Sequence, residues 1–167
     1  GYATQNLTLV QSQYVTGSAA NSITFSGLDG DTDQLYLLQY YLKIGGPSAA
    51  TYSITLKPNN VTTNQTTFSR TTSTASTTPN ATTSTFVLAS AARGSEYYTN
   101  VHISAYKAVQ RVFSAESILY ANSTVYLSDG MLFWNDTGNN LTSIVLAGSS
   151  TGNFDVGSAF HLYKYSV

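Results

Sequence analysis

The sequence predicts an all-β protein, an antiparallel β-sandwich of jelly-roll type with about ten strands. Apolar residues alternate with polar ones at a period close to two along most of the chain, and β-branched and aromatic residues are frequent. Turn-forming residues recur at short intervals between these segments. Because 42% of the 167 residues are apolar and 13% are aromatic, the chain can form a packed core of one domain.

The alternation places strands along the whole chain and leaves little room for helix. Apolar residues such as Val109, Val112 and Ile118 are interleaved with charged ones and could alternatively form a short helix, but the β-branched and aromatic steps there favour a strand. The expected strands are Asn6–Val15, Ser22–Ser26, Gln34–Ile44, Tyr52–Lys57, Thr85–Ser90, Tyr98–Tyr106, Val112–Tyr120, Thr124–Leu127, Met131–Trp134, Leu141–Ala147 and Ala159–Tyr165.

Three segments differ from this pattern. Residues 1–20 are mostly polar and form either an arm that lies on a neighbouring subunit or a strand of the domain itself, so we separate them from the single sandwich domain at 21–167. Leu28–Asp33 is a turn signal between two strands. Asn59–Thr83 is rich in Thr, Ser and Asn with almost no apolar residue, which predicts an exposed loop or sheet rim.

The charge of the chain excludes several kinds of partner. Charged residues make up only 9% of the chain, against about a quarter in a typical protein, and the net charge is −1. The seven Lys and Arg residues form no cluster, so binding to nucleic acid or to an anionic membrane is not expected. No apolar run approaches the roughly 20 residues that span a bilayer. Without cysteine, disulfides and thiolate metal sites are excluded.

Candidate groups for catalysis or metal binding are few. Asp29, Asp31 and Asp33 alternate as carboxylates do in a calcium loop, but Tyr40 stands where the bidentate Glu should be, so a plain turn is the favoured interpretation. The two histidines each stand alone in an expected strand. There is no nucleophile elbow and no glycine-rich phosphate loop. We expect a non-enzymatic protein without metal or cofactor.

Asn-x-Ser/Thr triplets are the most frequent motif. A chain so rich in Asn, Thr and Ser makes such triplets by chance, so they are either accidental or true N-glycosylation sites on a secretory or archaeal surface route. The candidate sites are Asn6, Asn60, Asn64, Asn80, Asn122, Asn135 and Asn140.

The number of aromatic residues predicts a contact surface. Thirteen tyrosines, seven phenylalanines and one tryptophan exceed what one small core usually holds. Tyrosine is favoured at protein–protein and sugar-binding surfaces because it joins a large contact area to a polar tip. A surface with few charges also loses little hydration energy when it is covered. The candidate residues for a subunit interface are Tyr36, Tyr40, Tyr41, Tyr97, Tyr98, Trp134, Tyr163 and Tyr165.

The closing segment carries a more specific likeness. Residues 141–146, Leu-Thr-Ser-Ile-Val-Leu, lead through a Gly/Ser turn to residues 152–165, Gly-Asn-Phe-Asp-Val-Gly-Ser-Ala-Phe-His-Leu-Tyr-Lys-Tyr. This resembles tailed-bacteriophage virion proteins with a jelly-roll or β-sandwich domain, in which an Ile-Thr-Ser-Ile strand is followed by Asn-Phe-x-x-Gly-Ser and a last strand ending in Leu-Tyr-Gly. Lys164 stands where that last Gly would be.

Earlier segments agree with this likeness in the same order, at Ser22–Gly30, Leu35–Leu38 and Leu56–Asn60. The resemblance implies a viral structural protein, foremost a capsid decoration (cement) protein on the virion exterior that binds the major capsid protein and copies of itself, commonly as a homotrimer. Head-fibre and tail proteins of the same group imply an alternative, receptor or glycan binding. The triplets favour a further alternative, a glycosylated extracellular filament subunit assembled by strand donation.

The same closing segment predicts how the last strand is held. Glycines at 152 and 157 supply the backbone freedom that a tight connection needs. The apolar residues expected to anchor the last strand in the core are Phe154, Val156, Phe160 and Leu162.

Overall fold

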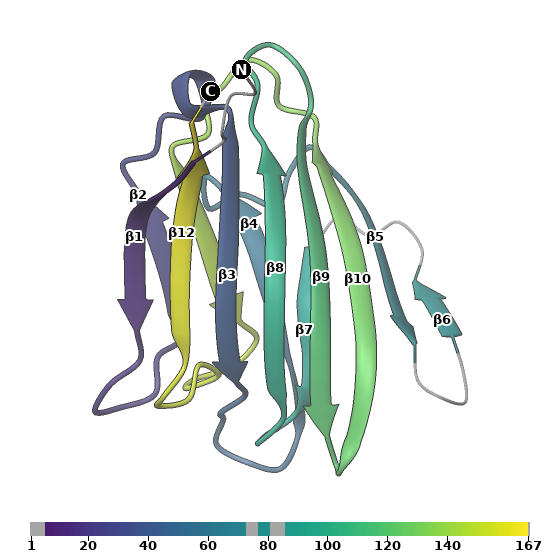
Figure 1. Ribbon diagram of the computed structural model, residues 1–167. Helices are drawn as coiled ribbons and strands as arrows, with labels where there is room; N and C mark the ends of the chain where they lie inside the picture. The colour runs from purple at the N-terminus through teal and green to yellow at the C-terminus, as the bar shows by residue number, and fades with distance from the viewer. Residues whose placement is uncertain (1–5, 73–76, 81–85, 167) are drawn as a thin grey trace.

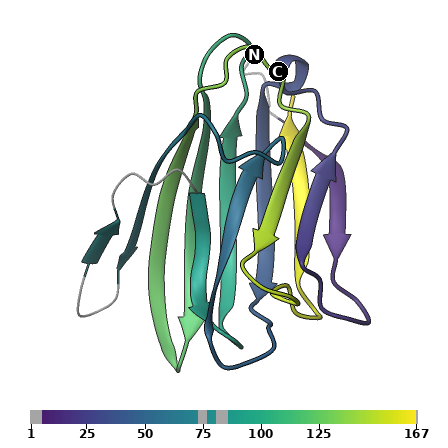
Figure 2. The same cartoon turned by 180° about the vertical axis from the view of Figure 1, so that it is seen from behind.

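The protein is a two-layer antiparallel β-sandwich, as the sequence predicts. The computed structural model describes residues 6–72, 77–80 and 86–166, and within them twelve strands form an eight-stranded and a four-stranded sheet. Figure 1 looks onto the larger sheet and Figure 2 onto the smaller one behind it. The large sheet has the order β1 (Leu7–Tyr14), β12 (Ala159–Tyr165), β3 (Leu35–Lys43), β8 (Glu96–Ser104), β9 (Arg111–Ala121), β10 (Thr124–Trp134), β5 (Gln65–Thr72) and β6 (Thr77–Asn80). The small sheet has the order β2 (Ser22–Ser26), β11 (Ser143–Gly148), β4 (Thr51–Pro58) and β7 (Phe86–Ala92).

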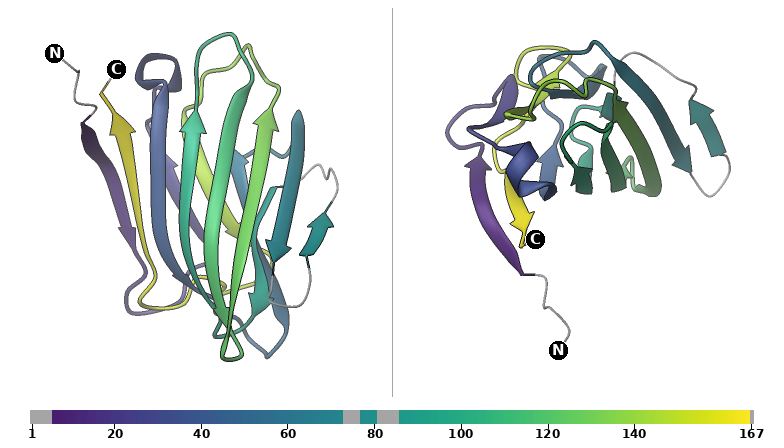
Figure 3. Two further views of the ribbon diagram at one scale, coloured as in Figure 1. Left: turned by 45° about the vertical axis from the view of Figure 1, so that its right-hand side comes forward. Right: turned by 90° about the horizontal axis from the view of Figure 1, so that it is seen from above.

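Eight of the strands pair in a nested fashion. β1 pairs with β12, β2 with β11, β3 with β8 and β4 with β7, so that the first strand meets the last and each inner pair is closed in turn. The four remaining strands are insertions: β5 and β6 follow β4, and β9 and β10 follow β8. All four add to one side of the large sheet, and β5 and β6 form its far edge (Figure 3).

The core lies between the two sheets. Along β8, for example, Tyr97, Thr99, Val101 and Ile103 are buried while the residues that alternate with them are exposed, which is the period of two that the sequence predicts. The bulkiest fully buried apolar side chains include Phe25, Tyr36, Phe86, Phe113, Trp134, Phe154 and Phe160.

Of two expectations about loops and strands, one holds in its sheet-rim form and the other is wrong. The segment 59–83, expected to be an exposed loop or a sheet rim, contains β5 and β6, which form the rim of the large sheet. The β-branched threonines there suit a strand, and β10 supplies the pairing partner of β5. Residues 73–76 and 81–83 of that segment lie outside the described residues. The strands expected at 124–127 and 131–134 are one continuous strand, β10, which Gly130 does not interrupt. Glycine is needed at this position because a Cβ there would lie 2.8 Å from the Phe86 ring.

The N-terminal segment and the suspected helix are both strands of this domain. Leu7–Tyr14, within the possible arm at 1–20, pairs with β12 of the same chain, while residues 1–5 lie outside the described residues. The helix considered around Val112 is absent, because those residues form β9 between β8 and β10. The expected turn at 28–33 contains a one-turn helix, α1 (Gly30–Asp33).

Side chains of β1 also reach the neighbouring edge of the small sheet. Gln11 and Gln13 each donate a hydrogen bond from the side-chain amide to a backbone carbonyl of β2, those of Ser26 and Thr24. β2 is an edge strand, and the unpaired backbone of such a strand can recruit foreign strands. The two glutamines therefore cover part of this edge.

The closing segment is anchored largely as expected. Phe154, Phe160 and Leu162 are fully buried, and the rings of Phe154 and Phe160 lie 5.8 Å apart between centres. Val156 is the exception, since it is 44% exposed in the connection before β12. The expectation that it anchors the strand is wrong because the chain turns outward there between two buried stretches.

The connection before β12 depends on backbone geometry and one buried amide. Gly152 and Gly157 have φ of 65° and 95°, conformations that side chains other than glycine rarely adopt. Asn153 is fully buried; its side chain accepts a hydrogen bond from the Ser150 amide and donates one to the Gly45 carbonyl. These contacts tie the last loop to the end of β3.

We predict that Phe154→Ala lowers the free energy of unfolding by about 3 kcal/mol, because truncating a fully buried aromatic ring leaves a cavity. Val156→Ala, two residues away and exposed, serves as the control and is expected to change it by less than about 0.5 kcal/mol. Chemical denaturation of both variants measures the difference. Equal stability of the two variants would contradict the anchoring role of Phe154.

Candidate functional site

The outer face of the large sheet carries most of the exposed apolar side chains. Neighbouring strands present them side by side, since Ile118 pairs with Leu127 and Phe68 with Met131 in the strand register. We call the patch on β9, β10 and β5 the apolar wing; its residues are between 37% and 62% exposed. It consists of Ile118, Tyr120, Val125, Leu127, Met131, Phe133 and Phe68.

The outer face of the small sheet is different. Its strands present hydroxyl side chains to solvent, such as Ser22 and Thr24 on β2 and Ser53 and Thr55 on β4. The two outer faces therefore differ: that of the large sheet carries an apolar patch, and that of the small sheet is polar. Contiguous exposed apolar surface is uncommon on monomeric proteins and marks contact sites.

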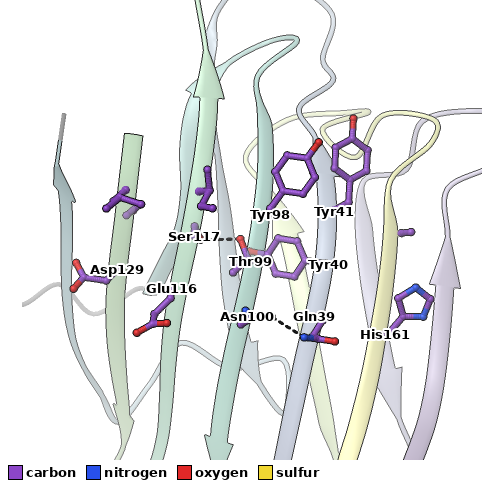
Figure 4. A pocket seen from close by; sticks show the side chains of 14 residues that line it. Gln39, Tyr40, Tyr41, Tyr98, Thr99, Asn100, Glu116, Ser117, Asp129 and His161 are labelled. Carbon is purple, nitrogen blue, oxygen red and sulfur yellow. Dashed lines mark hydrogen bonds between the residues drawn. The ribbon is translucent and has the colours of Figure 1, made fainter. Parts of the chain in front are cut away.

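A groove crosses the outer face of the large sheet beside the apolar wing. It has a volume of about 870 Å³ and runs over β12, β3, β8, β9 and β10 (Figure 4). At a strand spacing of about 4.8 Å, five strands give it a length of about 19 Å. Ile118 and Leu127 belong both to the groove and to the wing. None of the described residues that line it is a lysine or an arginine.

Aromatic rings line one side of the groove. The rings of Tyr41 on β3 and Tyr98 on β8 are register partners whose centres lie 5.1 Å apart, and Tyr98 is 51% exposed. The hydroxyl of Tyr41 donates a hydrogen bond of 3.0 Å to the carboxylate of Glu96. Partial burial, reinforced by that carboxylate, raises the pKa of Tyr41 to about 12. Tyr41 is therefore neutral, and its hydrogen bond to Glu96 holds the ring in place.

A polar row lies next to the aromatic pair. His161, Gln39, Asn100, Glu116 and Asp129 are successive register partners across the five strands, so their side chains share one line (Figure 4). The side-chain amide of Gln39 donates a hydrogen bond of 2.9 Å to the side-chain oxygen Oδ1 of Asn100.

Two further hydrogen bonds lie next to this row, one at its β12 end and one on the core side of the same sheet. The His161 Nδ1 lies 2.9 Å from the Ser12 hydroxyl on β1. Inside the sandwich, the hydroxyls of Thr99 and Ser117 are joined by a buried hydrogen bond of 2.7 Å. The groove is thus a preformed surface of amides, carboxylates and aromatic rings.

The structure divides the predicted interface residues into two groups. Tyr36, Tyr40, Tyr97 and Trp134 are buried between the sheets, so the interface prediction is wrong for them: their strand positions point inward. The remaining residues lie on the outer face, half-buried or exposed: Tyr41, Tyr98, Tyr163 and Tyr165.

The wing residues were missed by sequence reasoning. The available signal was that β9 and β10 carry apolar residues at both odd and even positions, which is expected only when both faces of a strand are covered.

The three alternating aspartates do not converge. Asp29 caps α1 and accepts hydrogen bonds from Thr32 and Asn140, which lower the pKa of its carboxyl. Asp31 pairs with Arg111 at 3.0 Å, and Asp33 pairs with Lys164 at 2.7 Å. Throughout the described ranges, no three His, Cys, Asp or Glu side chains gather as metal ligands would.

The two histidines lie apart, on β8 and β12 with β3 between them. His161 lines the groove, whereas His102 lines a smaller hollow of about 360 Å³ farther along the same face.

The candidate glycosylation sites differ in accessibility. Asn140 is half-buried and both ends of its side chain are engaged, since it accepts from the Asp31 amide and donates to Asp29. The side chain of Asn80 lies outside the described part of the chain. The exposed candidates are Asn6, Asn60, Asn64, Asn122 and Asn135.

Buried Arg111 clamps one end of the sandwich. Its guanidinium, with the side chain 1% exposed, pairs with Asp31 of α1, donates to the backbone carbonyl of Asp136 and lies 5.4 Å from the centre of the Trp134 ring. It thereby joins the start of β9, the end of β10 and α1.

Comparisons with protein-family models, with curated proteins and with solved structures found no match. The one helix among the described residues, α1, has four residues and cannot cross a membrane.

We predict that Arg111→Met lowers the free energy of unfolding by about 3 kcal/mol, because the substitution removes a buried guanidinium and leaves the partly buried Asp31 without its partner. Lys43→Met is the matched control: Lys43 and Asp155 lie 3.4 Å apart but both side chains are partly exposed to solvent, and such a pair contributes under about 1 kcal/mol. Denaturant titration of both variants tests the contrast. A Lys43 variant as unstable as the Arg111 variant would refute it.

The raised pKa values of the buried tyrosines predict that the folded protein becomes less stable in alkali. Burial raises the pKa of Tyr36 and Tyr40, and that of Tyr97 to about 12. Because the folded state holds these protons more tightly than the unfolded chain, the stabilisation is complete below pH 10 and is lost as the pH rises toward 12. Unfolding free energies measured across that interval should fall, and Tyr97→Phe should make the fall shallower. A pH-independent value would contradict this.

Proposed function

We propose that the protein is a non-enzymatic structural component of a virion, a capsid decoration protein that binds the exterior of the shell and copies of itself as a homotrimer. The observation that carries this proposal is the apolar wing. Seven large apolar side chains on three neighbouring strands stay exposed in the single chain, and covering them releases water at little electrostatic cost because the chain has so few charges.

The order in which the strands pair supports the proposal by analogy with other proteins that have this strand order. Nested pairing of eight strands in two sheets is the strand order expected of a jelly roll, an architecture used by viral capsid domains and by lectins. A fold by itself does not fix a function. The analogy therefore adds to the argument from the wing and does not replace it.

The mechanism would be mechanical. A rigid sandwich that buries its wing against sister subunits and the major capsid protein links neighbouring units of the shell. Because the protein binds only the assembled state, its binding stabilises that state by mass action. No titratable group needs to act in such a role.

A second candidate, receptor or glycan recognition by a fibre or tail protein, is favoured by the groove with its aromatic pair and polar row. The filament alternative has less support, since donation of the N-terminal strand would require β1 to leave β12, with which it pairs along its whole length.

We predict that a Val125→Lys, Met131→Lys double variant loses self-association and capsid binding, because both side chains are exposed on the wing and neither lines the groove. The control is Thr24→Lys on the polar outer face of the small sheet. Sedimentation velocity measures the oligomeric state, and cosedimentation with stripped particles measures binding.

The unmodified protein and the Thr24 variant should sediment as trimers and rebind the particles. If the unmodified protein stays monomeric and binds no particles, the proposal is wrong.

A further inference from the structure

We propose that the groove on the outer face of the large sheet binds a neutral oligosaccharide. The proposal is independent of the virion role, because it rests on the lining of the groove and not on the wing. It assigns a ligand class to the surface formed by the aromatic pair and the polar row.

The repeated unit of the site is an aromatic residue and an amide two positions apart on one strand. β3 presents Gln39 and Tyr41, and β8 presents Asn100 and Tyr98, so the two rings are register partners and so are the two amides. Positions two apart on a strand are about 7 Å from each other. A sugar ring can therefore stack its C–H face on a tyrosine while its hydroxyls reach the amides.

The chemistry of the lining matches hydroxyl groups. Amides both donate and accept hydrogen bonds, carboxylates accept them, and tyrosine offers an apolar ring with a polar tip. Glu116 extends the polar row beyond the two amides, and His161 flanks it at the other end. Side chains along one line that can donate and accept hydrogen bonds suit the repeated hydroxyls of a linear glycan.

Other ligand classes fit less well. Nucleic acids and sulfated or sialylated glycans need basic side chains, and no described lining residue is basic, whereas Glu116 adds negative charge. A purely apolar ligand would strip water from the carboxylate and the amides without replacing their hydrogen bonds. The groove also has the volume of a small-ligand site, which is about 300–1,000 Å³.

The site is already in its binding shape. Hydrogen bonds fix Gln39 to Asn100, Tyr41 to Glu96 and His161 to Ser12. Side chains held in this way lose little conformational freedom when a ligand binds, which lowers the entropic cost of association.

The test is titration calorimetry with neutral oligosaccharides derived from starch, cellulose and mannan, and with heparin-derived oligosaccharides as the anionic arm. Tyr98→Ala should weaken binding of the neutral ligand at least about tenfold, the equivalent of about 1.4 kcal/mol, while Tyr98→Phe, which keeps the ring, should retain it. Asn100→Ala should weaken binding similarly. His102→Ala, on the same strand but outside the groove, is the matched control.

Binding of a neutral oligosaccharide that is lost in Tyr98→Ala and Asn100→Ala, but kept in His102→Ala and in the Val125→Lys, Met131→Lys variant, supports the site. No binding of any neutral probe, preference for heparin fragments, or binding that Tyr98→Ala leaves unchanged overturns it. The wing variant separates the two proposals, since it should lose self-association and keep the sugar. Circular dichroism of each variant confirms that it is folded.

Discussion

The alternation of side chains along a β-strand is the constraint on which the rest of this structure depends. On β8 the odd-numbered residues from Tyr97 to Ile103 fill the core, so the even-numbered ones between them must face outward. Of these, Tyr98 and Asn100 line the groove and His102 lines the smaller hollow. On β9 and β10 most of the outward positions are apolar as well, which produces the wing. Core and outer surface are therefore set by the same register, and a shift of one residue would exchange them.

Charged residues are few, and two of their ion pairs meet at α1, where Asp31 pairs with Arg111 and Asp33 with Lys164. Arg111, Asp31 and Asp29 with Asn140 form a connected set of hydrogen bonds that joins α1 to the ends of β9 and β10. Elsewhere the polar contacts are mostly between hydroxyls, amides and backbone groups. The α1 end is thus sensitive to acid, since the pKa of Asp29 is lowered and protonation removes its contacts.

Period-two patterning was enough to predict the sandwich and most of its strands, but not the threonine-rich strand β5. Its pairing is decided by β10, some sixty residues away in sequence, and local composition contains no record of that contact. Burial was equally hard to read for tyrosine: Tyr40 and Tyr41 are neighbours, yet one lies in the core and the other in the groove. The groove itself required the register of five strands, which local patterns do not supply.

The glutamines that cover part of the β2 edge make the two rims of the sandwich different. They sit at the rim formed by β1 and β2, while the wing lies toward the opposite rim formed by β5 and β6. Part of the β2 edge is thereby occupied, whereas contact through the wing joins side chains and needs no free strand edge.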